Sequence, residues 1–246
     1  MKKYIFIMCL GLISHAAFAQ TDTLHIYGPG GPLSAMQDCA KAFTTKTGIP
    51  VIVLGGPEPK WLAKAQQNAD VIYGGAEYML TQFIQAHPGM VDVSTRVELY
   101  KRRAAILVRP GNPKHIATLK DLIKPGMHIL DVNGAGQFGL WEDIAGKEYL
   151  IGGIQRNIAG SFANTALGID AWKKDNNYDA WITYASWHQN LQAITQIVEL
   201  PLSLRLYRGT PVALATNSKH GMQAKQFVQF LQSPAGHTIF KKWGWE

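Results

Sequence analysis

Short apolar runs alternate along the first half of the chain with stretches in which apolar residues recur at helical spacing. Runs rich in β-branched and aromatic side chains indicate strands, and the 3.6-residue period between them indicates helices. This alternation is typical of an α/β fold with a largely parallel sheet. The predicted strands are Leu24–Tyr27, Val51–Leu54 and Asp70–Tyr73, and the helices that follow them lie over 33–43, 61–67 and 77–86.

The second half repeats this alternation between two longer segments, 97–108 and 203–215. Each long segment carries a tyrosine, then basic residues, then an apolar stretch, and its length predicts a strand that crosses between two lobes. We therefore expect lobe I to comprise 20–103 and 208–246, and lobe II to comprise 104–207. The remaining predicted elements are strands over 127–132, around 158 and 180–184, and helices over 138–145, 165–173, 222–231 and 236–243.

The first residues have the pattern of an export signal. Lys2 and Lys3 precede an apolar run over 4–12, and Ala17-Phe18-Ala19 then supplies the small-x-small pattern that signal peptidase accepts. We therefore predict a signal peptide over 1–19 and a mature protein in the periplasm. The apolar run is too short to cross a bilayer, and no later segment resembles a membrane helix, so no stable membrane insertion is expected.

The charge balance favours an anionic partner. The chain has 24 Lys and Arg against 17 Asp and Glu, a formal charge of +7, and loss of the signal peptide would remove Lys2 and Lys3 but no acidic residue. The basic residues are scattered, which argues against nucleic-acid binding. Cys9 would leave with the signal, so Cys39 is predicted to remain as a free, buried thiol.

Glycine-rich turns follow several predicted strands and precede helices. Glycine lets the backbone approach a ligand closely, and a helix start offers unpaired N–H groups that bind anions. Because the carboxyl ends of parallel strands share one edge of a sheet, we expect these turns to meet around one ligand. Asn164 is also placed to cap the helix that starts near Thr165. The predicted ligand-binding residues in the turns are Gly30, Gly31, Gly55, Gly56, Gly136, Gln137, Asn164 and Thr165.

Few charged or hydroxyl-bearing side chains lie near the predicted edge. Arg156 and Arg103 are the candidate cations, and each is equally an ordinary surface residue by its sequence context. Tyr184 closes the strand over 180–184 and could aim its hydroxyl into the cleft; the alternative is a buried core tyrosine. The ligand-binding prediction therefore includes Arg156 and Tyr184.

The sequence contains little evidence for a catalytic or a nucleotide-binding site. The turn over 28–32 has neither the G-x-G-x-x-G spacing nor a following Gly-Lys-Ser/Thr. Ser186, His188 and Asp179 lie close in sequence, but no G-x-S-x-G elbow surrounds a serine, and the histidines lack metal-ligand spacing. We therefore predict no catalytic residue, no metal, no cofactor and no enzymatic activity.

Several segments resemble a known family of binding proteins. The segments that resemble periplasmic molybdate-binding proteins are Ala69–Tyr73, Ile182–Tyr184 and Phe240–Gly244. Closer still is the resemblance to accessory colonisation factor C, a member of that superfamily. The segments that carry it are Tyr27–Pro32, Gly139–Asp143 and Asn164–Trp172.

The resemblance covers essentially the whole mature chain. It implies a two-lobed type II periplasmic binding protein fold with two crossover strands, in agreement with the pattern of strands and helices. It also implies that Tyr184 and the loops before four helices line the ligand, those that start at Leu33, Trp61, Phe138 and Thr165. Molybdate binders carry hydroxyl-bearing residues in the first two of these loops, where this chain has Gly and Pro.

The sequence therefore predicts an extracytoplasmic solute-binding protein that captures a small sulfate-like oxyanion between two lobes. A small carboxylate, such as an amino acid or citrate, is the alternative ligand. Expected partners are an ABC permease or a chemoreceptor, and the protein is expected to be a monomer. The alternatives of other classes are a periplasmic hydrolase or transferase on an anionic substrate, and an adhesion or signalling protein whose cleft has lost its ligand.

Overall fold

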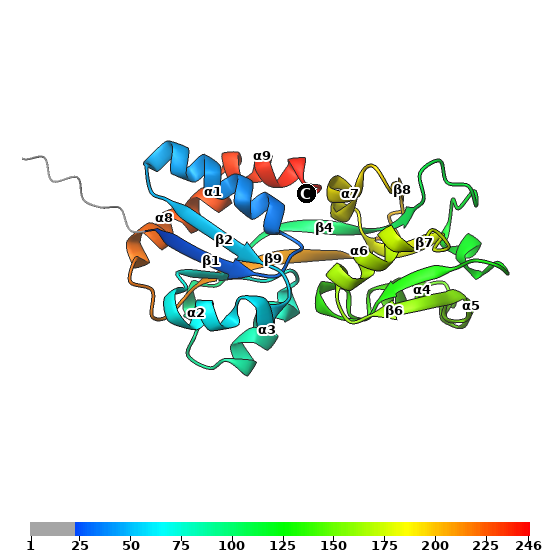
Figure 1. Ribbon diagram of the computed structural model, residues 1–246, viewed down its shortest axis with the longest axis horizontal. Helices are drawn as coiled ribbons and strands as arrows, with labels where there is room; N and C mark the ends of the chain where they lie inside the picture. Colours follow the sequence, from blue (N-terminus) through cyan, green and yellow to red (C-terminus); the bar gives the residue numbers. More distant parts are fainter. Residues whose placement is uncertain (1–22) are drawn as a thin grey trace, which may run out of the picture.

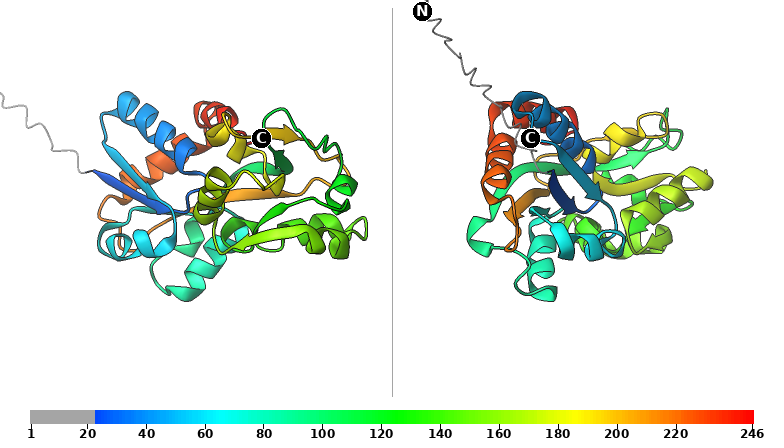
Figure 2. Two further views of the ribbon diagram at one scale, coloured as in Figure 1. Left: turned by 45° about the vertical axis from the view of Figure 1, so that its right-hand side comes forward. Right: turned by 60° about the vertical axis from the view of Figure 1, so that its left-hand side comes forward.

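The computed structural model describes residues 23–246, and the predicted signal peptide over 1–19 lies outside them. Two groups of strands and helices lie next to each other along the longest axis, and the long strands β4 (Val97–Val108) and β9 (Tyr207–Leu214) run between them (Figure 1). The further views separate the same groups (Figure 2). We call the group that holds β1 (Leu24–Gly28) the N-terminal lobe, and the group that holds β5 (Ile129–Val132) the central lobe.

The N-terminal lobe begins with three parallel strands, each followed by a helix, as predicted. β1 lies between β2 and β3, with both neighbours parallel to it. Helix α1 ends at Gly48, where a φ of 75° places the backbone in the left-handed region that favours glycine. The elements of this lobe are β2 (Val51–Gly55), β3 (Val71–Tyr73), α1 (Leu33–Thr47), α2 (Leu62–Asn68), α3 (Glu77–Ala86), α8 (Gly221–Gln232) and α9 (Pro234–Lys242).

Both crossing strands are present, and β4 belongs to both lobes. Its first part pairs antiparallel with β9, with Arg102 opposite Arg208 and Arg103 opposite Tyr207. From Ala104 onward it pairs antiparallel with β7 (Ala180–Tyr184) and, near its end, with β8 (Gln196–Val198). β9 in turn pairs with β3, so the two strands connect the sheets of the two lobes. The division of the chain into lobes at the predicted residue boundaries stays a prediction.

The central lobe repeats the parallel arrangement around β5. This strand pairs in parallel with β6 and β7, and helices follow the strands on both faces. The other elements of the lobe are β6 (Ile158–Phe162), α4 (Leu140–Gly146), α5 (Ile151–Asn157), α6 (Thr165–Lys174) and α7 (Ser186–Leu191). Short 3₁₀ helices are η1 (Glu58–Lys60), η2 (Val93–Thr95), η3 (Leu119–Ile123) and η4 (Ala135–Gln137).

The sequence prediction differs from the structure at several element ends and at three short elements. The second crossing strand begins at Tyr207, later than the predicted position 203. The helix predicted over 138–145 begins at Leu140, because Gly139 before it has a left-handed φ of 68°. The elements α5, α7 and β8 were not predicted, since their sequences show no clear hydrophobic period: α5 buries only Ile154, and β8 has no fully buried residue.

Each sheet is covered on both faces by apolar side chains. In β1, Ile26 packs with α1, α8 and α9 on one face, whereas the adjacent Tyr27 packs with α2 and α3 on the other. Cys39 lies buried in the first of these clusters as a free thiol, and burial raises its pKa to about 12. Among the described residues, no helix has both the length and the apolar character needed to cross a bilayer.

Candidate ligand-binding site

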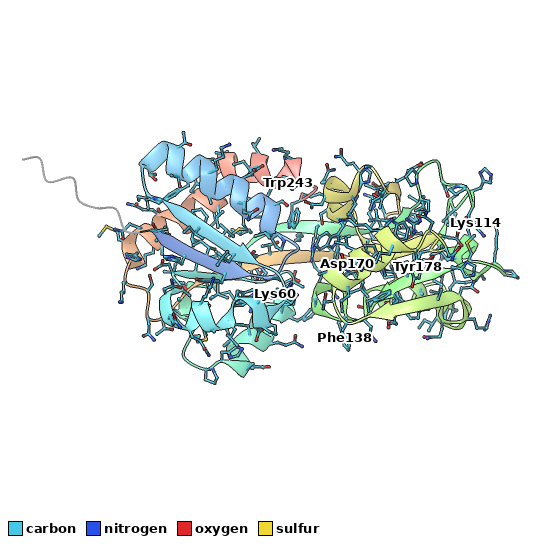
Figure 3. All side chains as sticks on the ribbon, in the orientation of Figure 1. Lys60, Lys114, Phe138, Asp170, Tyr178 and Trp243 are labelled. Carbon is cyan, nitrogen blue, oxygen red and sulfur yellow. The ribbon has the colours of Figure 1, made fainter. Side chains whose placement is uncertain are left out.

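Turns from both lobes surround a cavity of about 450 Å³. In the N-terminal lobe these turns join β1 to α1, β2 to α2 and β3 to α3; in the central lobe they join β5 to α4 and β6 to α6. Figure 3 labels Lys60 on the N-terminal lobe, and Phe138 and Asp170 on the central lobe. The carboxyl ends of parallel strands share one edge of a sheet, and here two such edges contribute to one cavity.

Three glycines of the N-terminal lobe that line this cavity have backbone N–H groups without a partner among the described residues. Pro32, at the start of α1, provides no side-chain cap. Within residues 23–246, the N–H groups of Gly30, Gly31 and Gly75 donate no hydrogen bond. Unpaired N–H groups at helix starts carry partial positive charge, so this wall suits an anion.

Arg102 of β4 is the cation of the cavity. It is only 2% exposed, and its Nη2 donates to the carbonyl oxygen of Gly75 at 2.6 Å. Its Nε and Nη1 are buried and have no hydrogen-bond partner, and no carboxylate of the described residues forms an ion pair with it. Burial lowers the pKa of this guanidinium. Burying a cation with two unpaired donors destabilises the folded protein unless an anion binds and accepts hydrogen bonds from them.

The guanidinium of Arg102 lies between two glycines, one from each lobe. A Cβ atom on Gly31 would lie 2.9 Å from Nη1, and one on Gly136 would lie 2.9 Å from Nη2. A larger residue at either position would therefore push the guanidinium aside. Beneath it, the ring of Tyr184 lies 3.9 Å from Cζ, and the Tyr184 hydroxyl donates to the carbonyl oxygen of Gly136 at 2.6 Å.

The central lobe contributes an oriented hydroxyl at the start of α6. Asn164 caps this helix as predicted, accepting a hydrogen bond from the Leu167 N–H at 3.1 Å. Trp181 Nε1 donates to Gln137 Oε1 at 3.2 Å, and Gln137 Nε2 donates to Thr165 Oγ1 at 2.9 Å. Because Thr165 Oγ1 accepts from Gln137, its own proton remains available to a ligand. Gln137 thus positions the hydroxyl.

The structure brings most of the predicted site residues together. Those that line the cavity are Gly30, Gly31, Gly56, Gly136, Gln137, Asn164 and Thr165. Three others do not line it. A Cβ on Gly55 would lie 2.7 Å from the Tyr73 hydroxyl oxygen. Arg156 lies exposed on α5, and Tyr184 is fully buried with its hydroxyl bonded to Gly136. Arg102, which was not among the predicted residues, lines the cavity, and the ring of Tyr184 packs against its guanidinium. The ligand-binding roles of Arg156 and Tyr184 stay predictions.

Ser186 and His188, which lie close together in the sequence, do not hydrogen-bond to each other. His188 Nδ1 hydrogen-bonds Thr195 Oγ1 at 2.8 Å, and Ser186 Oγ is buried with no partner in the described part of the chain. The Arg103 guanidinium, the other candidate cation, bonds Glu199 and Glu246 instead of facing the cavity.

Two α/β lobes joined by crossing strands, with one cavity lined by helix starts from both, define a type II periplasmic binding protein. The family model of the bacterial extracellular solute-binding proteins matches residues 24–246. The chain belongs to this family. No curated protein matches it by sequence.

Solved structures agree with this membership. Peb3 from Campylobacter jejuni is 31% identical, with a TM-score of 0.83, and the match covers 91% of this chain and 99% of that one. A Peb3 structure with L-phospholactate bound has the same identity and coverage and a TM-score of 0.84. The sulfate-binding protein SubI from Mycobacterium tuberculosis is 18% identical, with a TM-score of 0.75 over 91% of this chain and 86% of that one, and shows the fold alone.

Proposed function

We propose that this protein captures a small anion between its two lobes, outside the cytoplasm, and presents it to a membrane transporter or a chemoreceptor. The observation that carries the proposal is Arg102, a buried guanidinium in the cavity with Nε and Nη1 unpaired. An oxyanion can accept from both atoms, from the free N–H groups of the turns and from the Thr165 hydroxyl. Oriented neutral donors add to one positive charge without burying a second.

Two ligand classes fit this donor set, sulfate-like oxyanions and small organic anions with a carboxylate or phosphate group. The Peb3 structure that contains L-phospholactate, at 31% identity, supports the organic class. The SubI relationship supports the sulfate class only through the fold. In both cases the proposed mode of capture is the same. The lobes close on the anion, and exclusion of water strengthens the hydrogen bonds to it.

The proposal includes export and delivery. The signal peptide predicted over 1–19 would bring the mature chain to the periplasm, where members of this family bind their solutes. A monomer with two lobes presents both lobe surfaces to a membrane partner, and ABC permeases read the closed form of such proteins. A chemoreceptor would read the same closed form.

The test is calorimetry on protein that has been unfolded, stripped of ligand and refolded. The panel is sulfate, molybdate, phosphate, citrate and aspartate. We expect at least one anion to bind, and at a hundredfold excess over its Kd to raise the stability by about 2.7 kcal/mol. X-ray scattering should show compaction with that anion. Absence of binding by every anion of the panel and of the organic series described below would overturn the proposal.

A further inference from the structure

The cavity has a second part that the capture of an inorganic anion does not use. Four apolar side chains that line it come from β3, from α3 and from the residue that precedes α2, and each is at most 6% exposed. We call this set the apolar pouch. Its members are Trp61, Ile72, Leu80 and Phe83.

The pouch offers no polar side-chain atom to a ligand. Trp61 has the one polar side-chain atom in the set, and its Nε1 donates to the carbonyl oxygen of Gly56 at 3.2 Å. The same bond fixes the indole ring, which also lies 5.6 Å from the ring of Phe83, centroid to centroid. Ordered water needs two to four polar partners, which these side chains do not supply. The pouch is therefore suited to an apolar group.

The pouch and the cationic end belong to one continuous wall. A Cβ on Gly136 would lie 2.9 Å from Arg102 Nη2 and 3.5 Å from the sulfur of Met79. Met79 is adjacent on α3 to Leu80 of the pouch, and both line the cavity. A ligand that reaches from Arg102 past Met79 thus enters the pouch.

Charge fixes the direction in which such a ligand binds. Glu58 lines the cavity next to Trp61 and is bonded through Oε1 to His87 Nε2 at 2.8 Å. A second negative charge near this carboxylate is disfavoured, whereas Arg102 at the other end has no carboxylate partner in the described chain. The anionic head therefore belongs at Arg102, and the uncharged part belongs beside Trp61.

The volume of the cavity agrees with a ligand larger than a tetraoxyanion. An inorganic tetraoxyanion fills roughly the space of two waters, on the order of 60 Å³. The cavity measures about 450 Å³, within the range of sites for small organic molecules. Sulfate at Arg102 would leave most of the cavity volume unfilled.

We infer that the physiological ligand is an organic anion with an apolar tail, held by its head at Arg102 and by its tail in the pouch. This inference rests on the proposed function and narrows its ligand class. Filling apolar space removes hydrocarbon from water, and each buried methylene should tighten binding about fourfold. Inorganic sulfate, acetate and methanesulfonate should be the weakest ligands.

The test is calorimetry with two series of fixed head group, the linear alkanesulfonates from methane- to butanesulfonate and the alkanoates from acetate to pentanoate. Inorganic sulfate is the reference without a tail. We expect the longest member of at least one series to bind roughly sixtyfold more tightly than the shortest. If sulfate binds but the affinity in both series stays constant or falls with chain length, the inference is overturned and the proposed anion capture is not. Absence of any binding would overturn both.

A pair of variants locates the tail. Leu80→Phe adds volume inside the pouch and should abolish the dependence of affinity on chain length. Leu202→Phe makes the same change at a residue that is 78% exposed, and should leave the series as in the wild type. A steep series that persists in folded Leu80→Phe would place the tail elsewhere and overturn the inference. The wild-type series decides the question if Leu80→Phe does not fold.

Discussion

Each face of β4 carries an arginine, one with unpaired donors and one in ion pairs. Arg102 and Arg103 are adjacent, so their side chains point to opposite faces of the strand. Arg102 faces the cavity, with Nε and Nη1 unpaired. Arg103 faces the other side, where Nη2 contacts Glu199 Oε1 at 2.5 Å and Nη1 contacts Glu246 Oε1 at 3.0 Å.

This difference separates a structural cation from one that is available to a ligand. The hydrogen bond with Glu199 raises the pKa of Arg103, and its ion pairs connect β4 to the C-terminal residue and to the segment after β8. Burial lowers the pKa of Arg102. Arg102 is therefore a buried positive charge whose desolvation cost an anion can offset.

The largest expected effect comes from removing the Arg102 charge. Arg102→Met keeps the length of the side chain but removes its donors, and should weaken anion binding at least a hundredfold, about 2.7 kcal/mol or more. The ligand-free variant should be as stable as the wild type or more so, because an unpaired buried charge is replaced by an apolar group. Calorimetry and thermal unfolding measure the two effects.

The matched control for that prediction is Arg103→Met, which should leave affinity unchanged within twofold and lower stability slightly. Equal losses of affinity in the two variants would contradict the assignment of ligand binding to Arg102 and of a structural role to Arg103.

A smaller effect is expected from moving the guanidinium without removing it. Gly136→Ala places a methyl group 2.9 Å from Arg102 Nη2, so the end of that flexible side chain must shift. We expect about a tenfold loss of affinity, or about 1.4 kcal/mol, with the fold retained. Gly152→Ala, where the nearest atom would lie 3.8 Å away on exposed α5, is the control and should bind normally. Unchanged affinity in Gly136→Ala would show that the position of the guanidinium is unimportant.

The Thr165 hydroxyl should contribute less than Arg102, because it is neutral. Thr165→Val should weaken binding about fivefold, near the usual 1 kcal/mol of a neutral hydrogen bond. Thr165→Ser keeps the oxygen that accepts from Gln137 Nε2 and should restore most of the affinity. If Ser and Val variants bind alike, the hydroxyl does not contact the ligand.

The smallest effect belongs to the other side of β4 and concerns acid stability. Hydrogen bonds from Arg103 lower the pKa of Glu199, so the ion pair stabilises the fold fully above pH 4.5, the ordinary value for Glu. This contribution is lost as the pH falls through the lower pKa of the folded state. Glu199 is partly exposed, so Glu199→Gln should cost less than about 1 kcal/mol at neutral pH and flatten the acid dependence of unfolding. Anion affinity at pH 7 should not change, and a large change would contradict the separation of the two sides.

The sequence was sufficient to predict the features that depend on local chemistry. Alternating apolar runs predicted the parallel strands, the Asn164 cap followed from its side-chain acceptor, and glycine-rich turns predicted most of the backbone that lines the cavity. Each of these depends on a few neighbouring residues, and each residue type has a physical reason to be there.

The identity of the cation depended on the register of β4, which the sequence does not reveal. In a strand, Arg102 points to the opposite face from its neighbours Lys101 and Arg103. Which face that is cannot be extrapolated from the residues before them, because the register with β9 shifts between Glu98 and Lys101. The face that meets the cavity is set by pairing with β9, more than 100 residues later in the chain. The apolar pouch was missed because its aromatic and aliphatic residues look like ordinary core positions.

The most direct test of the anion-capture account is a crystal structure of the protein with butanesulfonate or sulfate bound. The account predicts oxyanion atoms about 3 Å from Nε or Nη1 of Arg102, with the Thr165 hydroxyl among the donors. An anion bound at another place in the molecule, with these two nitrogens of Arg102 still unpaired, would contradict it.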